Sequence, residues 1–274
     1  MNQYFNVTSI GFSHIRANRP CQDFSASYSD GKRIVITACD GHGGDIYVRS
    51  QTGSKLAATA ALRAMLDVES LHFRQYTADE IAHSLKLNVL CEWNRLVNHH
   101  LRRHPLRAKE LSRLSKDEAE SLRQNPVRAY GSTLGCAMLL DNRLLCVNLG
   151  DGGCFLLKDG NVRPAFPEDE DEPVANVTHS LCGEDAFLHM NAEIFDARDL
   201  DGVLLCTDGV TAPYGSMENF KRALVHPVVR CLLNGKAEEV KRFIHTLGTQ
   251  CGIGDDVSLS VLLKDNIKAK DYQN

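Results

Sequence analysis

The feature that most constrains this chain is a β-branched apolar run that stops abruptly at an acidic residue. Residues Arg33–Cys39 are followed by Asp40-Gly41-His42-Gly43-Gly44. The run predicts a buried strand, and the glycines allow a sharp turn and a close approach of the backbone to a ligand. Because a carboxylate at the end of a buried strand is costly unless it is hydrated or paired, the pattern indicates a metal ligand, Asp40, beside a proton donor, His42.

The same arrangement recurs at distant points of the chain. Further carboxylates mark one end of an apolar run, and they are Asp23, Asp151, Asp208 and the adjacent pair Asp255 and Asp256. A single Asp-Gly pair is ordinary turn chemistry, but the whole set together with His42 favours a metal site. If the strands share one sheet system, these carboxylates can converge at one edge. Convergent oxygen ligands favour Mg²⁺ or Mn²⁺ over zinc.

Composition limits the class of protein. The 274 residues carry a net charge of −4, which argues against a nucleic-acid-binding surface. The first residues show neither a charged leader nor a long apolar segment, and no run approaches a membrane span, so we expect a cytoplasmic protein without a membrane partner. The ten cysteines are scattered without zinc spacing, which favours free thiols in a reducing compartment.

Periodicity predicts a single α+β domain over 1–274. The expected strands are 4–13, 33–39, 133–140, 143–149, 153–158, 203–207 and 257–263, with hairpin turns at Asp141-Asn142 and Asp159-Gly160. The expected helices are 51–66, 78–101 and 236–251, and the segment 101–124 is expected to be helical with a break near Pro105. In 236–251 the side chains expected to face inward are Val240, Phe243, Ile244 and Leu247. The segment 164–175, with its acidic run Glu168–Glu172, is expected to be a mobile solvated loop.

These motifs resemble the metal-dependent protein phosphatases of the PP2C type, over about 10–263. The segment Asp40–Gly44 is the family's most specific motif, and the other matching segments follow in the family's order. They are Tyr130-Gly131-Ser132-Thr133, Gly150-Asp151-Gly152, Thr207-Asp208-Gly209 and Gly254-Asp255-Asp256-Val257-Ser258. Pro20-Cys21-Gln22-Asp23 and the segment 176–182 look most like a bacterial subgroup that occurs near Ser/Thr kinases.

The resemblance implies a fold of two packed antiparallel β-sheets with α-helices outside, and a site for two Mn²⁺ or Mg²⁺ ions and a third, weaker ion. By resemblance the metal ligands are Asp23, Asp40, the carbonyl of Gly41, Asp151, Asp208 and Asp255. His42 would be the general acid for the leaving serine or threonine oxygen. Either Arg19 or Arg16 would bind the phosphate, with Arg19 favoured.

Some alternatives stay open. Gln22 stands where the family often has Glu, and Asp256 competes with Asp255 as a ligand. The leading hypothesis is a protein Ser/Thr phosphatase acting on phosphoproteins, with a Ser/Thr kinase or its targets as partners. The alternatives are a non-catalytic phosphoprotein-binding module on the same fold and a phosphohydrolase of small metabolites, because the metal site acts on the phosphoryl group and not on its carrier.

Overall fold

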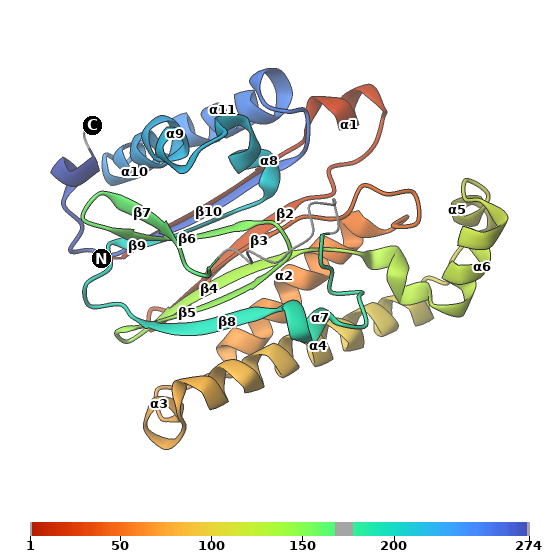
Figure 1. Ribbon diagram of the computed structural model, residues 1–274, viewed down its shortest axis with the longest axis horizontal. Helices are drawn as coiled ribbons and strands as arrows, with labels where there is room; N and C mark the ends of the chain where they lie inside the picture. The colour runs from red at the N-terminus through yellow and green to blue at the C-terminus, as the bar shows by residue number, and fades with distance from the viewer. Residues whose placement is uncertain (1, 168–177, 273–274) are drawn as a thin grey trace.

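The computed structural model describes residues 2–167 and 178–272, and the strands of this part form two antiparallel sheets packed face to face (Figure 1). The first sheet has the order β1 (Gln3–Ser9), β10 (Val257–Leu263), β9 (Gly202–Cys206), β6 (Gly153–Lys158) and β7 (Asn161–Pro164). The second has the order β2 (Phe24–Ser29), β3 (Arg33–Cys39), β4 (Leu134–Leu140), β5 (Arg143–Leu149) and β8 (Asn191–Asp196). The predicted pair of antiparallel sheets is confirmed.

Helices cover the outer face of each sheet (Figure 1). Helices α2 (Ser50–Leu66) and α4 (Ala78–Arg103) pack on the second sheet, and α10 (His226–Leu233) and α11 (Ala237–Thr246) pack on the first. The shorter helical elements are α1 (Phe12–Arg16), α3 (His72–Gln75), α5 (Ala108–Leu111), α6 (Lys116–Gln124), η1 (Pro126–Tyr130), α7 (Ala186–His189), α8 (Asp208–Thr211), η2 (Ala212–Tyr214), α9 (Met217–Phe220), η3 (Lys221–Val225), η4 (Leu247–Cys251) and η5 (Ala269–Tyr272).

Strand alternation divides the core into three apolar clusters. In β3, Ile36 faces the other sheet, where it belongs to the cluster that holds Leu205 of β9. Val35, one residue earlier, faces the helices and joins the cluster that holds Trp93 of α4. Successive side chains of a strand point to opposite faces, so one buried strand contributes to two clusters. This explains why β3 is apolar along nearly its whole length.

The structure corrects some predicted elements. The strand expected over 4–13 ends at Ser9, and α1 follows, because the Gly11 N–H turns away from the ladder to bond the Asp256 carboxylate. Strands β2 and β8 were not predicted, because their polar sequences conceal two strands at the edges of the second sheet. Phe243 of α11 was expected inside, but it is 36% exposed.

Other predictions are confirmed. Asp141 and Asp159 adopt positive φ angles of 55° and 49° in the β4–β5 and β6–β7 hairpins. Helix α4 ends at Arg103, close to the expected break at Pro105.

The acidic run 168–172 lies outside the described residues. Within the described ranges, no helix combines the length and apolar character needed to cross a membrane.

Candidate metal centre

Three carboxylates meet at one edge of the sandwich. One oxygen each of Asp40, Asp151 and Asp208 lie within 4.8 Å of one another. Asp40 follows β3 of the second sheet, Asp208 follows β9 of the first, and Asp151 lies in the connection from β5 to β6, between the sheets. The expected convergence of carboxylates that are far apart in the sequence is therefore confirmed for these three.

Asp23 is buried next to Asp40. It is only 4% exposed, its carboxylate accepts a 2.8 Å hydrogen bond from the Thr207 hydroxyl, and it shares a hydrogen bond with the side chain of Asp40. Burial raises the pKa of Asp23 to about 8, and the nearby charge of Asp256 adds to this shift. Burial, followed by the charge of Asp23, also raises the pKa of Asp40 well above its usual range.

The donor set fits a hard divalent cation. Burial and then the charge of Asp151 raise the pKa of Asp208 to about 6, so the carboxylates favour either protons or a cation in their midst. The convergent donors are carboxylate oxygens, which suit Mg²⁺ or Mn²⁺. Gly41 belongs to the same turn, and only glycine fits there, because an added Cβ would lie 2.6 Å from the carbonyl oxygen of Gln22.

The two adjacent carboxylates before β10 differ in their surroundings. Asp256 is 2% exposed and accepts hydrogen bonds from the backbone N–H groups of Gly11 (2.7 Å) and Gln22 (2.6 Å). The Nδ1 atom of His14 lies 2.8 Å from the same carboxylate. Asp255 is exposed, and its charge helps to raise the pKa of both Asp40 and Asp208. Asp255 is thus the carboxylate that faces the group, while Asp256 holds the N-terminal segment in place.

His42 lies in the turn next to the carboxylates. Its backbone N–H donates to the carbonyl of Gly131 (3.2 Å), and its ring packs on Tyr47 with centroids 4.9 Å apart. Burial lowers the pKa of His42, and the charge of Asp151 opposes this shift. Its Nε2 atom is buried and finds no hydrogen-bond partner among the residues that the structure describes. An imidazole with an open nitrogen is suited to exchange a proton with a ligand.

The two candidate arginines lie in different places. Arg19 reaches the His42 turn, where Nη1 donates to the carbonyl of Gly43 (3.3 Å) and Nη2 lies 3.4 Å from the carboxylate of Asp45. Arg16 extends from α1 and lies 5.3 Å from the ring centroid of Phe12. The placement therefore favours Arg19 as the group next to the metal centre.

Several supporting contacts were not identified from the sequence. The Gln22 amide donates to the carbonyl of His42 (3.3 Å) and to the Ser50 hydroxyl, so it supports the turn. The sequence places Thr207 directly before Asp208, but it does not indicate the hydrogen bond from the Thr207 hydroxyl to Asp23. Thr178, whose hydroxyl donates to Asp151 at 2.6 Å, gave no signal of that contact, because 27 residues separate the two.

The chain is similar to known proteins in sequence and in fold. The family model for protein phosphatase 2C matches residues 10–245. The Mycobacterium tuberculosis serine/threonine phosphatase PstP/Ppp is 19% identical with a TM-score of 0.59, over 96% of this chain and 98% of that one. Stp1 from Staphylococcus aureus is 14% identical with a TM-score of 0.59, over 97% and 96%. The PstP catalytic domain in complex with two manganese ions is 17% identical with a TM-score of 0.57, over 96% and 97%. No curated protein sequence matches the chain.

Proposed function

The chain belongs to the protein phosphatase 2C family, and we propose that it is a metal-dependent phosphatase that hydrolyses phosphoserine and phosphothreonine in proteins. The observation that carries this proposal is the convergence of Asp40, Asp151 and Asp208 beside a buried histidine nitrogen. The solved bacterial Ser/Thr phosphatases with the same fold support it.

In this proposal the acidic residues hold the metal ions. Asp40 and the Gly41 carbonyl, with Asp208 and Asp255, would hold one Mn²⁺ or Mg²⁺, and Asp23 would serve a second, directly or through water. Asp151, with Asp208, would hold a weaker third ion. When bound, these ions supply an activated water and neutralise charge on the phosphoryl oxygens.

The remaining groups act on the substrate. Arg19 would bind the phosphoryl oxygens through its exposed guanidinium, as arginine commonly does. Hydrolysis forms a bond from the water oxygen to phosphorus and breaks the bond from phosphorus to the serine or threonine oxygen. That alkoxide is a poor leaving group, so a proton donor is needed. The protonated His42 would deliver this proton from Nε2, the buried nitrogen.

The setting is also part of the proposal. All ten cysteines carry free thiols, which supports a reducing cytoplasm. A Ser/Thr kinase, or the targets of that kinase, would supply the phosphoprotein substrate.

The test is Mn²⁺-dependent phosphate release from a phosphothreonine peptide, with wild type beside Asp40→Asn and with nucleotides and sugar phosphates as competing substrates. We expect release from the peptide by wild type only. Faster turnover of the small phosphates would favour a metabolite phosphohydrolase. Peptide binding without turnover, together with absence of Mn²⁺ binding in calorimetry, would overturn the proposal in favour of a binding module.

A further inference from the structure

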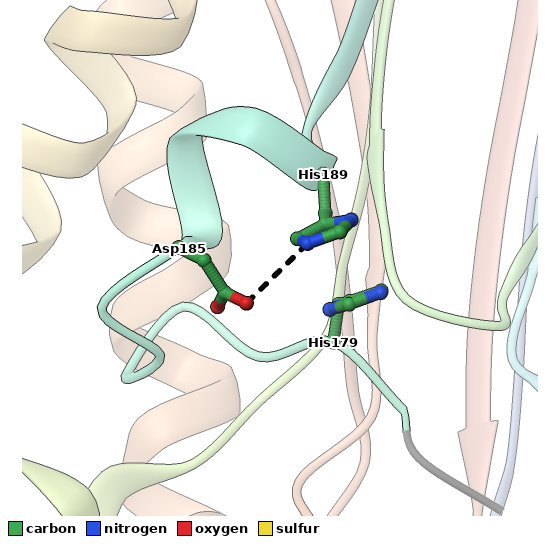
Figure 2. A group of neighbouring side chains, drawn as sticks. All are labelled: His179, Asp185 and His189. Carbon is green, nitrogen blue, oxygen red and sulfur yellow. Dashed lines mark ion pairs between the residues drawn. The ribbon is translucent and has the colours of Figure 1, made fainter. Parts of the chain in front are cut away.

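A second group of side chains that could hold a metal ion lies on the segment around α7 (Figure 2). One ligand atom each of His179, Asp185 and His189 lie within 4.8 Å of one another. The rings of His179 and His189 stack with centroids 3.5 Å apart, and Nε2 of His189 lies 3.3 Å from the Asp185 carboxylate. Asp185 and His189 are four residues apart, so they share one side of this helical turn.

This donor set differs in chemistry from the carboxylate centre. Two imidazoles and one carboxylate are ligands typical of zinc sites that keep a fourth position for water or another ligand. Imidazole ligands suit Zn²⁺, whereas sites of oxygen ligands alone suit Mg²⁺ and Mn²⁺. We propose that His179, Asp185 and His189 form a binding site for Zn²⁺ that fixes the segment 178–190 against the edge of the metal centre.

The side chains of Asp185 and His189 can rotate toward an ion held by His179. Asp185 and His189 are 56% and 37% exposed, so little packing opposes the change. In a tetrahedral zinc site with bonds of about 2.0–2.2 Å, the ligand atoms lie roughly 3.3–3.6 Å apart. The three ligand atoms therefore need to approach one another only modestly, and the backbone between them can stay in place.

The backbone that carries these ligands is already anchored. Ser132 donates its N–H to the Ser180 hydroxyl (3.0 Å) and accepts the Leu181 N–H at its carbonyl (3.0 Å). On α7 the ring of Phe187 packs edge-on against His83 of α4, with Lys86 above its face. Zn²⁺ would thus join two ends of a preformed segment, which lowers the entropic cost of assembling the site.

The site has a direct structural route to the metal centre. Thr178, next to His179, donates its hydroxyl to Asp151. Ser132, which holds Ser180, also forms a backbone bridge with Gly41. A Zn²⁺ ion bound to His179 would therefore restrain the neighbouring Thr178, whose hydroxyl orients Asp151. Partners of this kind around a ligating carboxylate commonly change metal affinity by 10–100-fold.

The test uses the full chain loaded with excess Mg²⁺, titrated with Zn²⁺ in a calorimeter. We expect one Zn²⁺ per chain, with affinity reduced about 100-fold or more in His179→Ala and His189→Ala, because these remove ligands themselves. The surface variant His99→Ala and the carboxylate-centre variant Asp208→Asn should keep the Zn²⁺ affinity of wild type. Hydrogen exchange at 178–190 should slow with Zn²⁺ in wild type and stay unchanged in His189→Ala.

The proposal does not depend on phosphatase activity, so its failure is separate from failure of the proposed function. Zn²⁺ binding that survives in both histidine variants but is lost in Asp208→Asn would place the ion at the carboxylate centre and overturn the proposal. Absence of Zn²⁺ binding to the Mg²⁺-loaded wild type would also overturn it.

Discussion

At the scale of single residues, the two neighbouring aspartates before β10 have different surroundings. Asp256 is buried and bonded to two backbone N–H groups, whereas Asp255 is exposed toward the other carboxylates. Adjacent residues of a strand entry point to opposite sides, so two identical side chains meet different surroundings. The sequence order suggests Asp255 as the ligand, but only the contacts of Gly11 and Gln22 reveal what Asp256 does.

This difference predicts that replacing Asp by Asn lowers stability at position 256 and lowers activity at position 255. Asp256→Asn should lower the free energy of unfolding by about 1–3 kcal/mol, because an amide cannot replace both charged acceptors of the Gly11 and Gln22 N–H groups. Asp255→Asn should change stability by less than about 0.5 kcal/mol yet lower turnover at limiting Mn²⁺. Urea unfolding and Mn²⁺ activation curves measure the two effects. A stable Asp256→Asn or a fully active Asp255→Asn would contradict the assignment.

Arginine placement gives a second prediction at this scale. Arg19→Ala should lower kcat/KM for a phosphopeptide about tenfold, equivalent to about 1.4 kcal/mol, because a charged hydrogen-bond donor beside the centre is lost. Arg16→Ala serves as the matched control and should stay near wild type, since Arg16 packs over Phe12. Steady-state kinetics at saturating Mn²⁺ measure both variants. A larger loss of kcat/KM in Arg16→Ala than in Arg19→Ala would reverse the two assignments.

At the scale of elements, the metal-site turn rests on the beginning of α2. Arg49, directly before α2, is 8% exposed and bonds Glu110 through two nitrogens, at 2.8 and 3.0 Å. It also donates to the Tyr130 hydroxyl and to the carbonyl of Pro105. One guanidinium thus connects the start of α2 with α5 and η1, and it fixes the segment that leads from His42 into α2.

Arg49→Lys should therefore destabilise the protein by about 2–3 kcal/mol, because an ammonium group lacks the planar fork and leaves buried acceptors unpaired. Arg63→Lys is the matched control, since Arg63 is 50% exposed where it pairs with Glu92. That exposed pair should contribute less than about 1 kcal/mol. The shift of the urea midpoint measures both, and equal shifts would contradict a special role for Arg49.

At the scale of the whole molecule, the predictable part of the structure is the part with strong local signals. Buried strands such as β3 and β10 are apolar runs, and the carboxylates at their ends were identified from sequence alone. Edge strands β2 and β8 are polar and half-covered, so local composition conceals them. The tethers of Asp256 and Asp151 depend on contacts across 245 and 27 residues, which no local pattern encodes.

The carboxylates gathered at one edge of the sandwich also make the stability of the metal-free protein depend on pH. Folded-state pKa values of about 8 for Asp23 and about 6 for Asp208 lie above the ordinary value of about 3.9 for the unfolded chain. At pH values between the unfolded-state pKa and the folded-state pKa of each group, the folded state therefore binds more protons than the unfolded state. By linkage, the stability contributed by these groups is present at low pH and is lost as pH rises through the folded pKa values.

We accordingly expect the Tm in chelator to fall by a few degrees from pH 5 to pH 8. The lowered pKa values of Glu92 and Glu110 act only below this range. The lowered pKa values of His42 and His100 act within it in the opposite sense and reduce the size of the fall. Asp208→Asn removes one titrating group and should flatten the fall between pH 5 and pH 7. Added Mn²⁺ should raise the Tm more at pH 8 than at pH 5, because protons compete with the ion at low pH. A metal-free Tm that rises across this range would show that the carboxylates are not crowded in the folded protein.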